Sequence, residues 1–347
     1  MNKRVTIGIT LGDVGGIGPE VAVKAALQTR WPRDLRLVLI GSPSIVAEEC
    51  RRAGYRTPPT VALTRKDRPA PRVSIWEPEP AAGSPSVRPG GVSRRAAELA
   101  AEWIYAGTAG ALAGWFDALV TAPISKEGLQ LARLPFPGHT EMLAALTRVS
   151  RFAMMLVGGP LRVVLVTRHI PLAKVPAELT SGKIVEAVVL AAEAMPWLGA
   201  RNRTIGVCAL NPHAGDGGAI GSEERTIIGP ALRSLRRRGI VVEGPVPADV
   251  IFHQAVGGRY GAVVAMYHDQ GLGPLKTLAF DTGVNVTLGL PIIRTSPDHG
   301  TAYDIAGKGQ ANPSSMRAAI RLAYELARRP NPWARRGGEE LVVNGES

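Results

Sequence analysis

The stretch Val263–Gly271, with the sequence VVAMYHDQG, decides the fold class because it joins an apolar run to a polar one. Its apolar part, Val263–Met266, is typical of a strand buried inside a sheet. The run stops at Tyr267–Gly271, whose side chains can donate or accept hydrogen bonds, ionise or bind a metal. Ligands of open α/β sheets bind at the carboxyl ends of the strands. His268 and Asp269 are therefore candidates for chemistry, although a solvated polar strand end would have the same sequence.

The length and composition of the chain indicate a globular protein with two lobes. Its 347 residues exceed the size at which a single hydrophobic core usually stops growing. Hydrophobic residues make up 45% of the chain and charged residues 20%, as in an ordinary globular protein. The 40 glycines and 28 prolines indicate many tight turns between short elements. We expect an α/β fold in which strands and helices alternate.

The net charge of +12 narrows the class of ligand. A basic protein can bind nucleic acid, an anionic surface or an anionic small molecule. The densest basic cluster, Arg233 with Arg236–Arg238, lies at the end of a predicted helix, where cations interact favourably with the helix dipole. Aromatic residues are only 5% of the chain and do not alternate with the basic residues, so no platform for stacking bases is expected. A phosphorylated small molecule is favoured over nucleic acid as the ligand.

No segment of the sequence indicates a membrane or an oxidising compartment. No apolar run reaches the roughly 18 residues that span a bilayer. Cys50 and Cys208 cannot form a disulfide framework, and neither belongs to a CxxC pair. Residues Met1–Arg4 lead directly into an apolar segment without the h-region of a signal peptide. We expect a cytoplasmic protein that does not bind membranes.

Other segments repeat the pattern of an apolar strand that ends in polar residues. The strand predicted at Val5–Thr10 leads into the glycine-rich Gly12–Glu20 and then a helix, an arrangement that can bind phosphate at the helix N-terminus. Its spacing matches neither G-x-G-x-x-G nor the P-loop, so neither motif can be assigned. Another strand, Asp117–Thr121, ends in Thr121–Lys126. The turn-forming Gly158–Pro160 predicts an antiparallel pair of strands on either side of it.

Three of the six histidines share one type of position. His169, His213 and His268 each come after an apolar strand. They lie 44 residues (169 to 213) and 55 residues (213 to 268) apart, which is not the spacing of a local zinc finger. Strands of one sheet can nevertheless bring their ends together, and three neutral imidazoles with an open position form a catalytic divalent-metal site. The shared position favours a metal site over three unrelated polar strand ends.

A further group of residues is suited to binding a phosphate or carboxylate through charge-assisted hydrogen bonds. Its members are His139, Thr140, Lys276, Asn285 and Arg294. Thr140 could instead cap the helix that follows Pro137–Glu141. No G-x-S-x-G sequence occurs and neither cysteine lies in a catalytic motif, so we expect no covalent nucleophile.

Seven segments form a set that is specific together, although each segment alone is common. They are Gly12–Glu20, Thr121–Lys126, Pro137–Glu141, Asn211–Gly215, Ala265–Gly271, Gly283–Gly289 and Arg294–Thr301. In this order the chain resembles the 4-hydroxythreonine-4-phosphate dehydrogenase (PdxA) family of vitamin B6 biosynthesis, from residue 5 to about residue 328. Three positions depart from the family pattern, because Val14-Gly15 replaces Pro-Ala, Ser125 replaces Asn, and Gly273–Leu275 replaces a bulkier apolar stretch. The departures leave the substrate open among phosphorylated four-carbon hydroxy acids.

The resemblance implies a two-lobed α/β/α sandwich like that of isocitrate and isopropylmalate dehydrogenases, with mixed sheets and an active-site cleft between the lobes. Lobe one would comprise residues 1–140 and about 290–347, and lobe two residues from about 141 to 290. Lobe two would carry much of the interface of a homodimer. The resemblance also implies one divalent ion per subunit (zinc, magnesium, manganese or cobalt), bound by His169, His213 and His268, with the partner subunit completing the site.

The resemblance further implies a reaction and an oxidant. NAD or NADP would oxidise 4-phosphooxy-L-threonine, which would lose CO2 to give 3-amino-2-oxopropyl phosphate. The substrate would lie on His139, Thr140, Lys276, Asn285 and Arg294. The catalytic group would comprise the three metal-binding histidines, Lys276 and Asp249, with Asp269 as a second candidate for the base. An Asp beside a metal-binding histidine more often orients that histidine.

Two alternatives remain open from the sequence. The first is a sister dehydrogenase that acts on D-threonate or D-erythronate 4-phosphate. The second is a basic anion-binding protein that uses the cleft without catalysis, for which salt-sensitive binding to polyanions would be expected.

Overall fold

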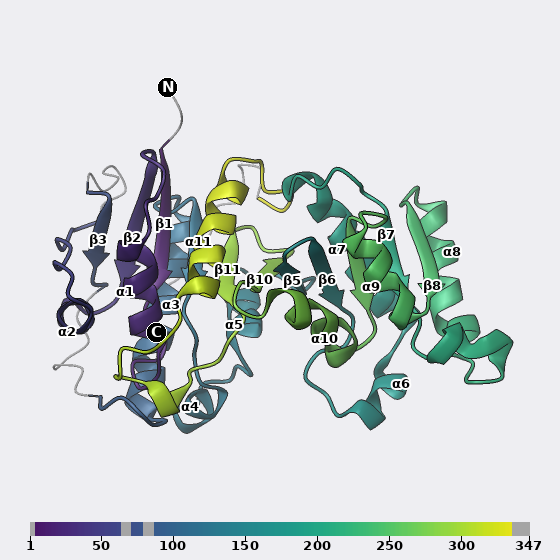
Figure 1. Cartoon of the computed structure of the whole chain (residues 1–347), viewed down its shortest axis with the longest axis horizontal. Helices are drawn as coiled ribbons and strands as arrows, with labels where there is room; N and C mark the ends of the chain where they lie inside the picture. The colour runs from purple at the N-terminus through teal and green to yellow at the C-terminus, as the bar shows by residue number, and fades with distance from the viewer. Residues whose placement is uncertain (1–3, 64–70, 79–86, 335–347) are drawn as a thin grey trace, which may run out of the picture.

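The computed structural model describes residues 4–63, 71–78 and 87–334. Their strands form one sheet that extends along the long axis of the molecule, in the order β3-β2-β1-β4-β11-β10-β5-β6-β9-β7-β8 (Figure 1). The strands are β1 (Val5–Thr10), β2 (Leu35–Ile40), β3 (Val73–Trp76), β4 (Ala118–Thr121), β5 (Ala153–Gly158), β6 (Leu161–Leu165), β7 (Ile205–Cys208), β8 (Val242–Val246), β9 (Ala262–Ala265), β10 (Val284–Leu288) and β11 (Arg294–Pro297). The predicted α/β class with mixed strand directions is confirmed, with one continuous sheet in place of separate ones.

Helices cover both faces of this sheet (Figure 1). The α-helices are α1 (Gly18–Gln28), α2 (Pro43–Ala53), α3 (Arg94–Leu112), α4 (Lys126–Leu131), α5 (His139–Leu146), α6 (Val175–Glu178), α7 (Ser181–Trp197), α8 (Gly229–Arg237), α9 (Ala248–Val256), α10 (His268–Ala279) and α11 (Ser314–Ala327). β1, β4 and β9 are buried along their whole length, as expected for a sheet between two helical layers.

The direction of the strands changes at the centre of the sheet. β10 is antiparallel to both of its neighbours, β11 and β5, and β5 is antiparallel to β6. On one side of this centre β3, β2, β1, β4 and β11 are parallel, and on the other side β6, β9, β7 and β8 are parallel. The segments that follow β6, β9 and β7 therefore all leave the sheet at the same edge.

The beginning and the end of the described chain lie in the same half of the molecule. β11 pairs with β4, and α11 packs against β11, β4 and α1. The predicted lobe boundaries near residues 140 and 290 are compatible with this arrangement and stay a prediction. Residues 1–3, 64–70, 79–86 and 335–347 of the predicted lobe one lie outside the described residues.

One helix differs from what the sequence pattern indicates. The polar residues after β9 begin α10 at His268, although Gly271, Gly273 and Pro274 are unfavourable inside a helix. The helix is held by packing, because Leu272 and Leu275 are buried in a cluster with side chains of β5 and β6. Tertiary contacts therefore override the local propensity. As a consequence His268 occupies the first turn of a helix instead of a loop.

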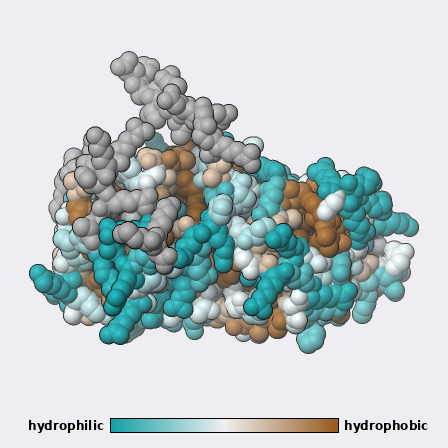
Figure 2. Space-filling model, turned by 90° about the horizontal axis from the view of Figure 1, so that it is seen from above, coloured by the Kyte–Doolittle hydropathy of each residue, from teal (hydrophilic) through white to brown (hydrophobic). Residues whose placement is uncertain are grey.

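Among the described residues, no helix is both long enough and apolar enough to cross a bilayer. Figure 2 shows that the face seen from above is mainly hydrophilic, with apolar side chains in separate places. Cys50 and Cys208 are both buried and form no disulfide.

Candidate active site

A cavity of about 860 Å³ lies at the centre of the molecule and is lined from both halves of the sheet. Thr121 at the end of β4 and the β11 residues Arg294 and Ser296 come from one half. His169, after β6, and His268 come from the other. The five residues predicted to bind substrate all line this one cavity, namely His139, Thr140, Lys276, Asn285 and Arg294. Residues that are up to 155 positions apart (139 to 294) in the sequence are thus brought together by the fold.

Arg294 forms the positively charged floor of the cavity. Its side chain is 1% exposed, and its Nε and Nη2 donate to Thr121 Oγ1 at 3.1 and 2.7 Å while Nη1 donates to Thr287 Oγ1 at 3.1 Å. Among the described residues it forms no salt bridge with a carboxylate. Burial lowers the pKa of the guanidinium to about 9. The charge of Glu141 opposes this shift, but the described hydrogen-bond partners of the guanidinium are hydroxyl groups, so the buried cation favours an anionic ligand.

His139 and Asn285 leave polar atoms without partners beside this cation. His139 Nε2 and Asn285 Oδ1 are buried and have no hydrogen-bond partner. Burial, and then the charge of Arg294, hold the pKa of His139 well below its usual value, so the imidazole is neutral. Unpaired buried polar atoms are costly, and a ligand whose hydroxyl or ammonium group donates a hydrogen bond would satisfy Asn285 Oδ1. The alternative role of Thr140 as a helix cap is wrong, because α5 begins at His139 and Gly138 is its N-cap.

Lys276 supplies a second positive charge at the cavity. Its Nζ lies 3.5 Å from Asp298 Oδ2 and donates to the Asp298 carbonyl oxygen at 3.3 Å. Burial raises the pKa of the Asp298 carboxyl, and Lys276 opposes that shift. Lys276 is also within 5.8 Å of the centre of the Phe280 ring. The lysine is thus held on the cavity wall, with its charge partly compensated by Asp298.

The structure adds charged residues to the cavity that were not assigned from the sequence. They are Lys126, Glu141, Arg168, Glu178, Lys183 and Asp298. Lys126, Glu141 and Asp298 lie inside the family segments, and that position was the available signal. Arg168 precedes His169 directly, and its guanidinium lies 3.7 Å from Glu141 and over the Phe152 ring. The wall of the cavity is therefore more highly charged than the predicted residues alone indicate.

Two of the three predicted metal-binding histidines lie together at the cavity. β6 and β9 are parallel neighbours, and the ring centroids of His169 and His268 are 5.6 Å apart. His268 Nδ1 lies 2.7 Å from Asp269 Oδ1, which leaves its Nε2 free to act as a ligand. Burial and then the charge of Lys126 lower the pKa of His169, which favours the neutral imidazole that metals bind.

His213 does not join them within one chain. β7 pairs with β9, so the strand end before His213 is adjacent, but the chain then enters a turn and His213 is exposed and does not line the cavity. Asp249 is also exposed, on α9, and is absent from the cavity wall. Across the described parts of the chain, no group of three His, Cys, Asp or Glu side chains is spaced to hold a metal. The three-histidine site therefore stays a prediction that needs a ligand from outside this chain.

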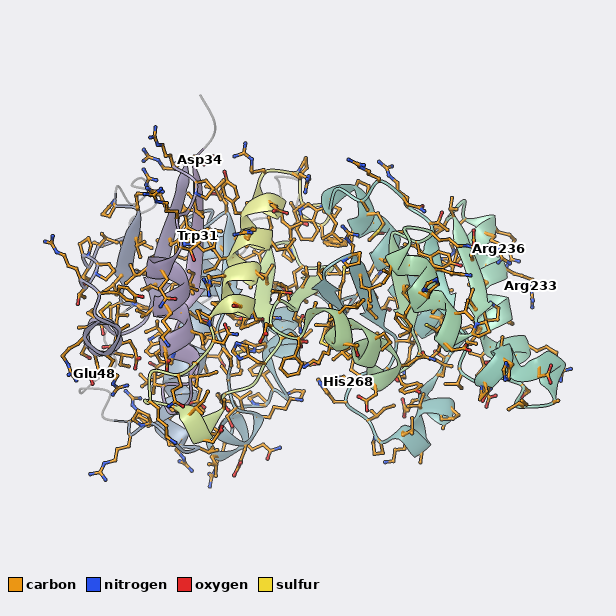
Figure 3. The ribbon with its side chains drawn as sticks, in the orientation of Figure 1. Trp31, Asp34, Glu48, Arg233, Arg236 and His268 are labelled. Atoms are coloured by element: carbon orange, nitrogen blue, oxygen red, sulfur yellow. The ribbon has the colours of Figure 1, made fainter. Side chains whose placement is uncertain are left out.

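The basic cluster on α8 is separate from the cavity. Figure 3 shows Arg233 and Arg236 at the far end of the molecule from His268. Both side chains belong to α8, which packs on α7 and β8. The charge that faces the cavity comes from other residues, chiefly Arg294, Lys276 and Lys126.

Comparison with known proteins identifies the family. A family model described as pyridoxal phosphate biosynthetic protein PdxA matches residues 34–323. The chain belongs to the PdxA family. In an alignment of 339 residues it is 44% identical to a 4-hydroxythreonine-4-phosphate dehydrogenase of Desulfosudis oleivorans, and the match covers 94% of this chain and 97% of the relative. It is 41% identical over 330 residues to a D-threonate 4-phosphate dehydrogenase of Pectobacterium atrosepticum, covering 92% of this chain and 99% of that protein.

A solved structure supports the same assignment for the PdxA-family chain. The crystal structure of a 4-hydroxythreonine-4-phosphate dehydrogenase from Klebsiella pneumoniae has a TM-score of 0.84 to this fold and 38% sequence identity. The similarity covers 95% of this chain and all of that one. The chain is therefore a PdxA-family dehydrogenase, as the resemblance implied, and the two names among its relatives leave the substrate to be decided.

Proposed function

We propose that this protein oxidises and decarboxylates 4-phosphooxy-L-threonine to 3-amino-2-oxopropyl phosphate, with NAD or NADP as oxidant, in pyridoxine 5'-phosphate biosynthesis in the cytoplasm. The observation that carries the proposal is the presence, in one cavity, of a buried Arg294 that forms no salt bridge among the described residues, together with the neighbouring His169 and His268. Arg294 suits the anionic groups of a phosphorylated amino acid. The two histidines suit a metal ion that would promote oxidation of a hydroxyl group near those anionic groups.

The substrate would bind mainly through its two anionic groups. Arg294 and Lys276 are positioned to neutralise a phosphate and a carboxylate. The buried Nε2 of neutral His139 and Oδ1 of Asn285, together with Thr140, provide hydrogen bonds that orient the molecule. Binding at several fixed points places the reacting carbon at one position relative to the histidines.

A divalent metal ion fits the donor set in part. His169 and His268 supply two neutral imidazoles from this chain, and the bond of His268 Nδ1 to Asp269 orients one of them. We propose that His213 of a second copy completes the site in a homodimer, since His213 is exposed here. When bound, zinc, magnesium, manganese or cobalt would lower the pKa of the substrate's C3 hydroxyl as a Lewis acid.

The chemistry then requires a base and a hydride acceptor. A base in the site would take the proton of the C3 hydroxyl, and NAD or NADP, when bound, would accept the hydride from C3. The product is a β-keto acid, which loses CO2 and takes up a proton to give 3-amino-2-oxopropyl phosphate. Asp269 is already bonded to His268, which supports an orienting role, and Asp249 would have to come from the second copy. Lys276 lies in the cavity and can stabilise developing negative charge.

A second candidate substrate is D-threonate 4-phosphate, favoured by the relative of Pectobacterium atrosepticum. It differs from 4-phosphooxy-L-threonine in carrying a hydroxyl group where the amino acid has an ammonium group. Side-by-side measurement of kcat/KM for both substrates, and for D-erythronate 4-phosphate, decides between them.

The first experiment measures NADH or NADPH formation at about 340 nm with 4-phosphooxy-L-threonine. The protein is stripped of metal with a chelator and then refilled with zinc, magnesium, manganese or cobalt. Turnover that disappears on stripping and returns on refilling supports the proposal. Absence of turnover under all of these conditions, for all three substrates, would contradict it, and salt-sensitive binding to polyanions would then favour the non-catalytic alternative.

Mixing two inactive variants tests whether the site is shared between subunits. In a mixture of His169→Ala and His213→Ala, half of the dimers are mixed and each mixed dimer has one intact site of its two. Activity should therefore recover to about a quarter of the wild-type value after subunit exchange. No recovery in demonstrably mixed dimers would contradict the shared site.

A further inference from the structure

The turn that carries His213 has an unusual backbone. After β7 the chain passes through residues 213–217 with φ angles of 51° at His213, 55° at Ala214 and 43° at Asp216, all in the left-handed region. Residues with a Cβ atom rarely adopt this region, and each costs free energy there. Such a run persists only when the surrounding structure determines it. The contacts that hold this turn are therefore informative.

Glu224 provides those contacts from the segment that precedes α8. Its Oε1 accepts hydrogen bonds from the backbone N–H groups of Leu210 at 2.9 Å and Asn211 at 2.7 Å. Its Oε2 accepts a further hydrogen bond from Asn211 Nδ2 at 2.9 Å. The residue is 8% exposed, so these bonds are shielded from water. One carboxylate thus holds the two residues that lead from β7 into the turn.

The turn also lies directly on this carboxylate. A Cβ atom added to Gly215, whose φ is +82°, would be 2.7 Å from Glu224 Oε2. Gly215 is itself buried. Glu224 therefore packs against the middle of the turn at Gly215, in addition to its hydrogen bonds with Leu210 and Asn211 at the beginning of the turn.

Gln270 connects the chain that leads into this turn to β9, the strand that precedes His268. Its Oε1 accepts from the Met266 N–H at 2.7 Å, and its Nε2 donates to the Ala209 carbonyl oxygen at 2.7 Å. Gln270 lies two residues after His268 and thereby joins the end of β9 to the end of β7. The backbone before His213 is held by Gln270 at Ala209 and by Glu224 at Leu210 and Asn211.

We propose that Glu224 is a positioning residue that fixes the left-handed turn and thereby the direction in which His213 is presented to a metal. This inference rests on the proposed function, in which His213 serves as a ligand for the site of a second copy. Glu224 does not line the cavity, so it would act through the backbone that carries His213. A carboxylate that served only to stabilise the fold would affect the unfolding temperature, whereas a positioning residue affects metal affinity in the folded protein.

The test compares zinc binding by the metal-free, full-length wild type and by Glu224→Gln. Glutamine has the same shape, but one of its two polar atoms is an NH2 group. In one orientation this group faces the Asn211 side-chain donor, and in the other it faces the Leu210 and Asn211 backbone N–H groups, so at least one hydrogen bond to the turn is lost. The dissociation constant for zinc should rise about 10- to 100-fold, as found when partners of metal ligands are removed. Hydrogen exchange of the Leu210 and Asn211 amides should become faster while the unfolding temperature stays near that of the wild type.

Glu243→Gln is the matched control. Glu243 lies on the neighbouring β8, and its Oε2 also accepts three hydrogen bonds, from Arg259 Nε and Nη2 and from Tyr260. Its described hydrogen bonds go to Arg259 and Tyr260 and not to the turn. The same chemical change there should leave zinc affinity unchanged.

Gly215→Ala is a second variant that disturbs the contact between the turn and Glu224. Its methyl group would push the turn away from the Glu224 carboxylate, while the Glu224 side chain itself is unchanged. It should weaken zinc binding as Glu224→Gln does. Normal zinc affinity in either variant would overturn the inference, and so would unfolding of metal-free Glu224→Gln. Normal zinc binding by His213→Ala would contradict the proposed function, in which His213 is a metal ligand. Loss of zinc binding in His213→Ala, but not in Glu224→Gln or Gly215→Ala, would contradict only the positioning role of Glu224.

Discussion

The two ends of the cavity differ in how complete they are within one chain. At the anion end, Arg294 is buried, held by Thr121 and Thr287, and surrounded by His139 and Asn285 with unpaired polar atoms. At the histidine end, His169 and His268 are in place and His213 points elsewhere on an exposed turn. Folding of a single chain brings the residues of the anion end together, whereas the proposed metal site at the histidine end would need a third ligand from a second copy.

This difference separates binding from catalysis in the proposed enzyme. The anion end is preorganised by hydrogen bonds inside the core, so it should bind phosphorylated ligands whatever the state of the histidines. The histidine end should respond to metal, to assembly and to the turn that carries His213. Variants at each end should therefore change different measured quantities.

The largest effect is expected for His213→Ala. Loss of one of three metal ligands should lower kcat by roughly 1,000-fold or more, because a bound metal contributes several kcal/mol to the transition state. The exposed side chain makes no described contact that stabilises the fold, so the unfolding temperature should be unchanged. Substrate binding measured by calorimetry should remain. Near-normal kcat in this variant would contradict the role of His213 as a metal ligand at the histidine end.

Arg294→Lys should weaken substrate binding and leave zinc binding unchanged, the reverse of what is expected for His213→Ala. Lysine cannot donate to Thr121, Thr287 and a ligand in the same planar geometry. Loss of charge-assisted hydrogen bonds should raise KM about 10- to 100-fold. Zinc affinity should be unchanged, because Arg294 lies at the other end. A normal KM, measured under metal saturation, would argue against Arg294 as an anion-binding residue.

A smaller effect is expected for Asp269→Asn. Its carboxylate accepts from His268 Nδ1 at 2.7 Å, but the side chain is 90% exposed, so solvent weakens the interaction. Zinc affinity should fall by about tenfold, at the lower limit for partners of metal ligands. KM should not change. A fall in kcat at saturating zinc, without a change in zinc affinity, would instead identify Asp269 as the catalytic base.

The smallest effect is a change in pH dependence at the anion end. The pKa of His139 is lowered by burial and by Arg294, so below pH 6.5 the unfolded chain takes up a proton that the folded protein does not. Stability from this residue is complete above pH 6.5 and is lost as the pH falls toward the lowered pKa. Urea unfolding of His139→Gln at pH 7 and pH 5 should therefore show a smaller loss of stability than the wild type. Equal losses in the two proteins would contradict a neutral buried His139.

Much of the fold was accessible from local patterns. Several strands were predicted where apolar runs end in polar residues, among them β1, β4 and β9, and the antiparallel pair around Gly158–Pro160 is β5 and β6. β8 (Val242–Val246) was not predicted. α10 was not predicted, because Gly271, Gly273 and Pro274 oppose a helix and only the burial of Leu272 and Leu275 stabilises it. Local propensity therefore failed where long-range packing supplies the stability.

The sequence by itself determined the family, the residue types of the anion site and the strand-end position of the three histidines. Only the tertiary structure decided that five distant residues share one cavity, that Asp298 compensates Lys276, and that His213 lies away from His169 and His268. The reason is physical: periodicity and turn residues report on interactions within a few positions. The direction of a side chain at a strand end depends instead on the loop that follows, here a left-handed turn supported by Glu224.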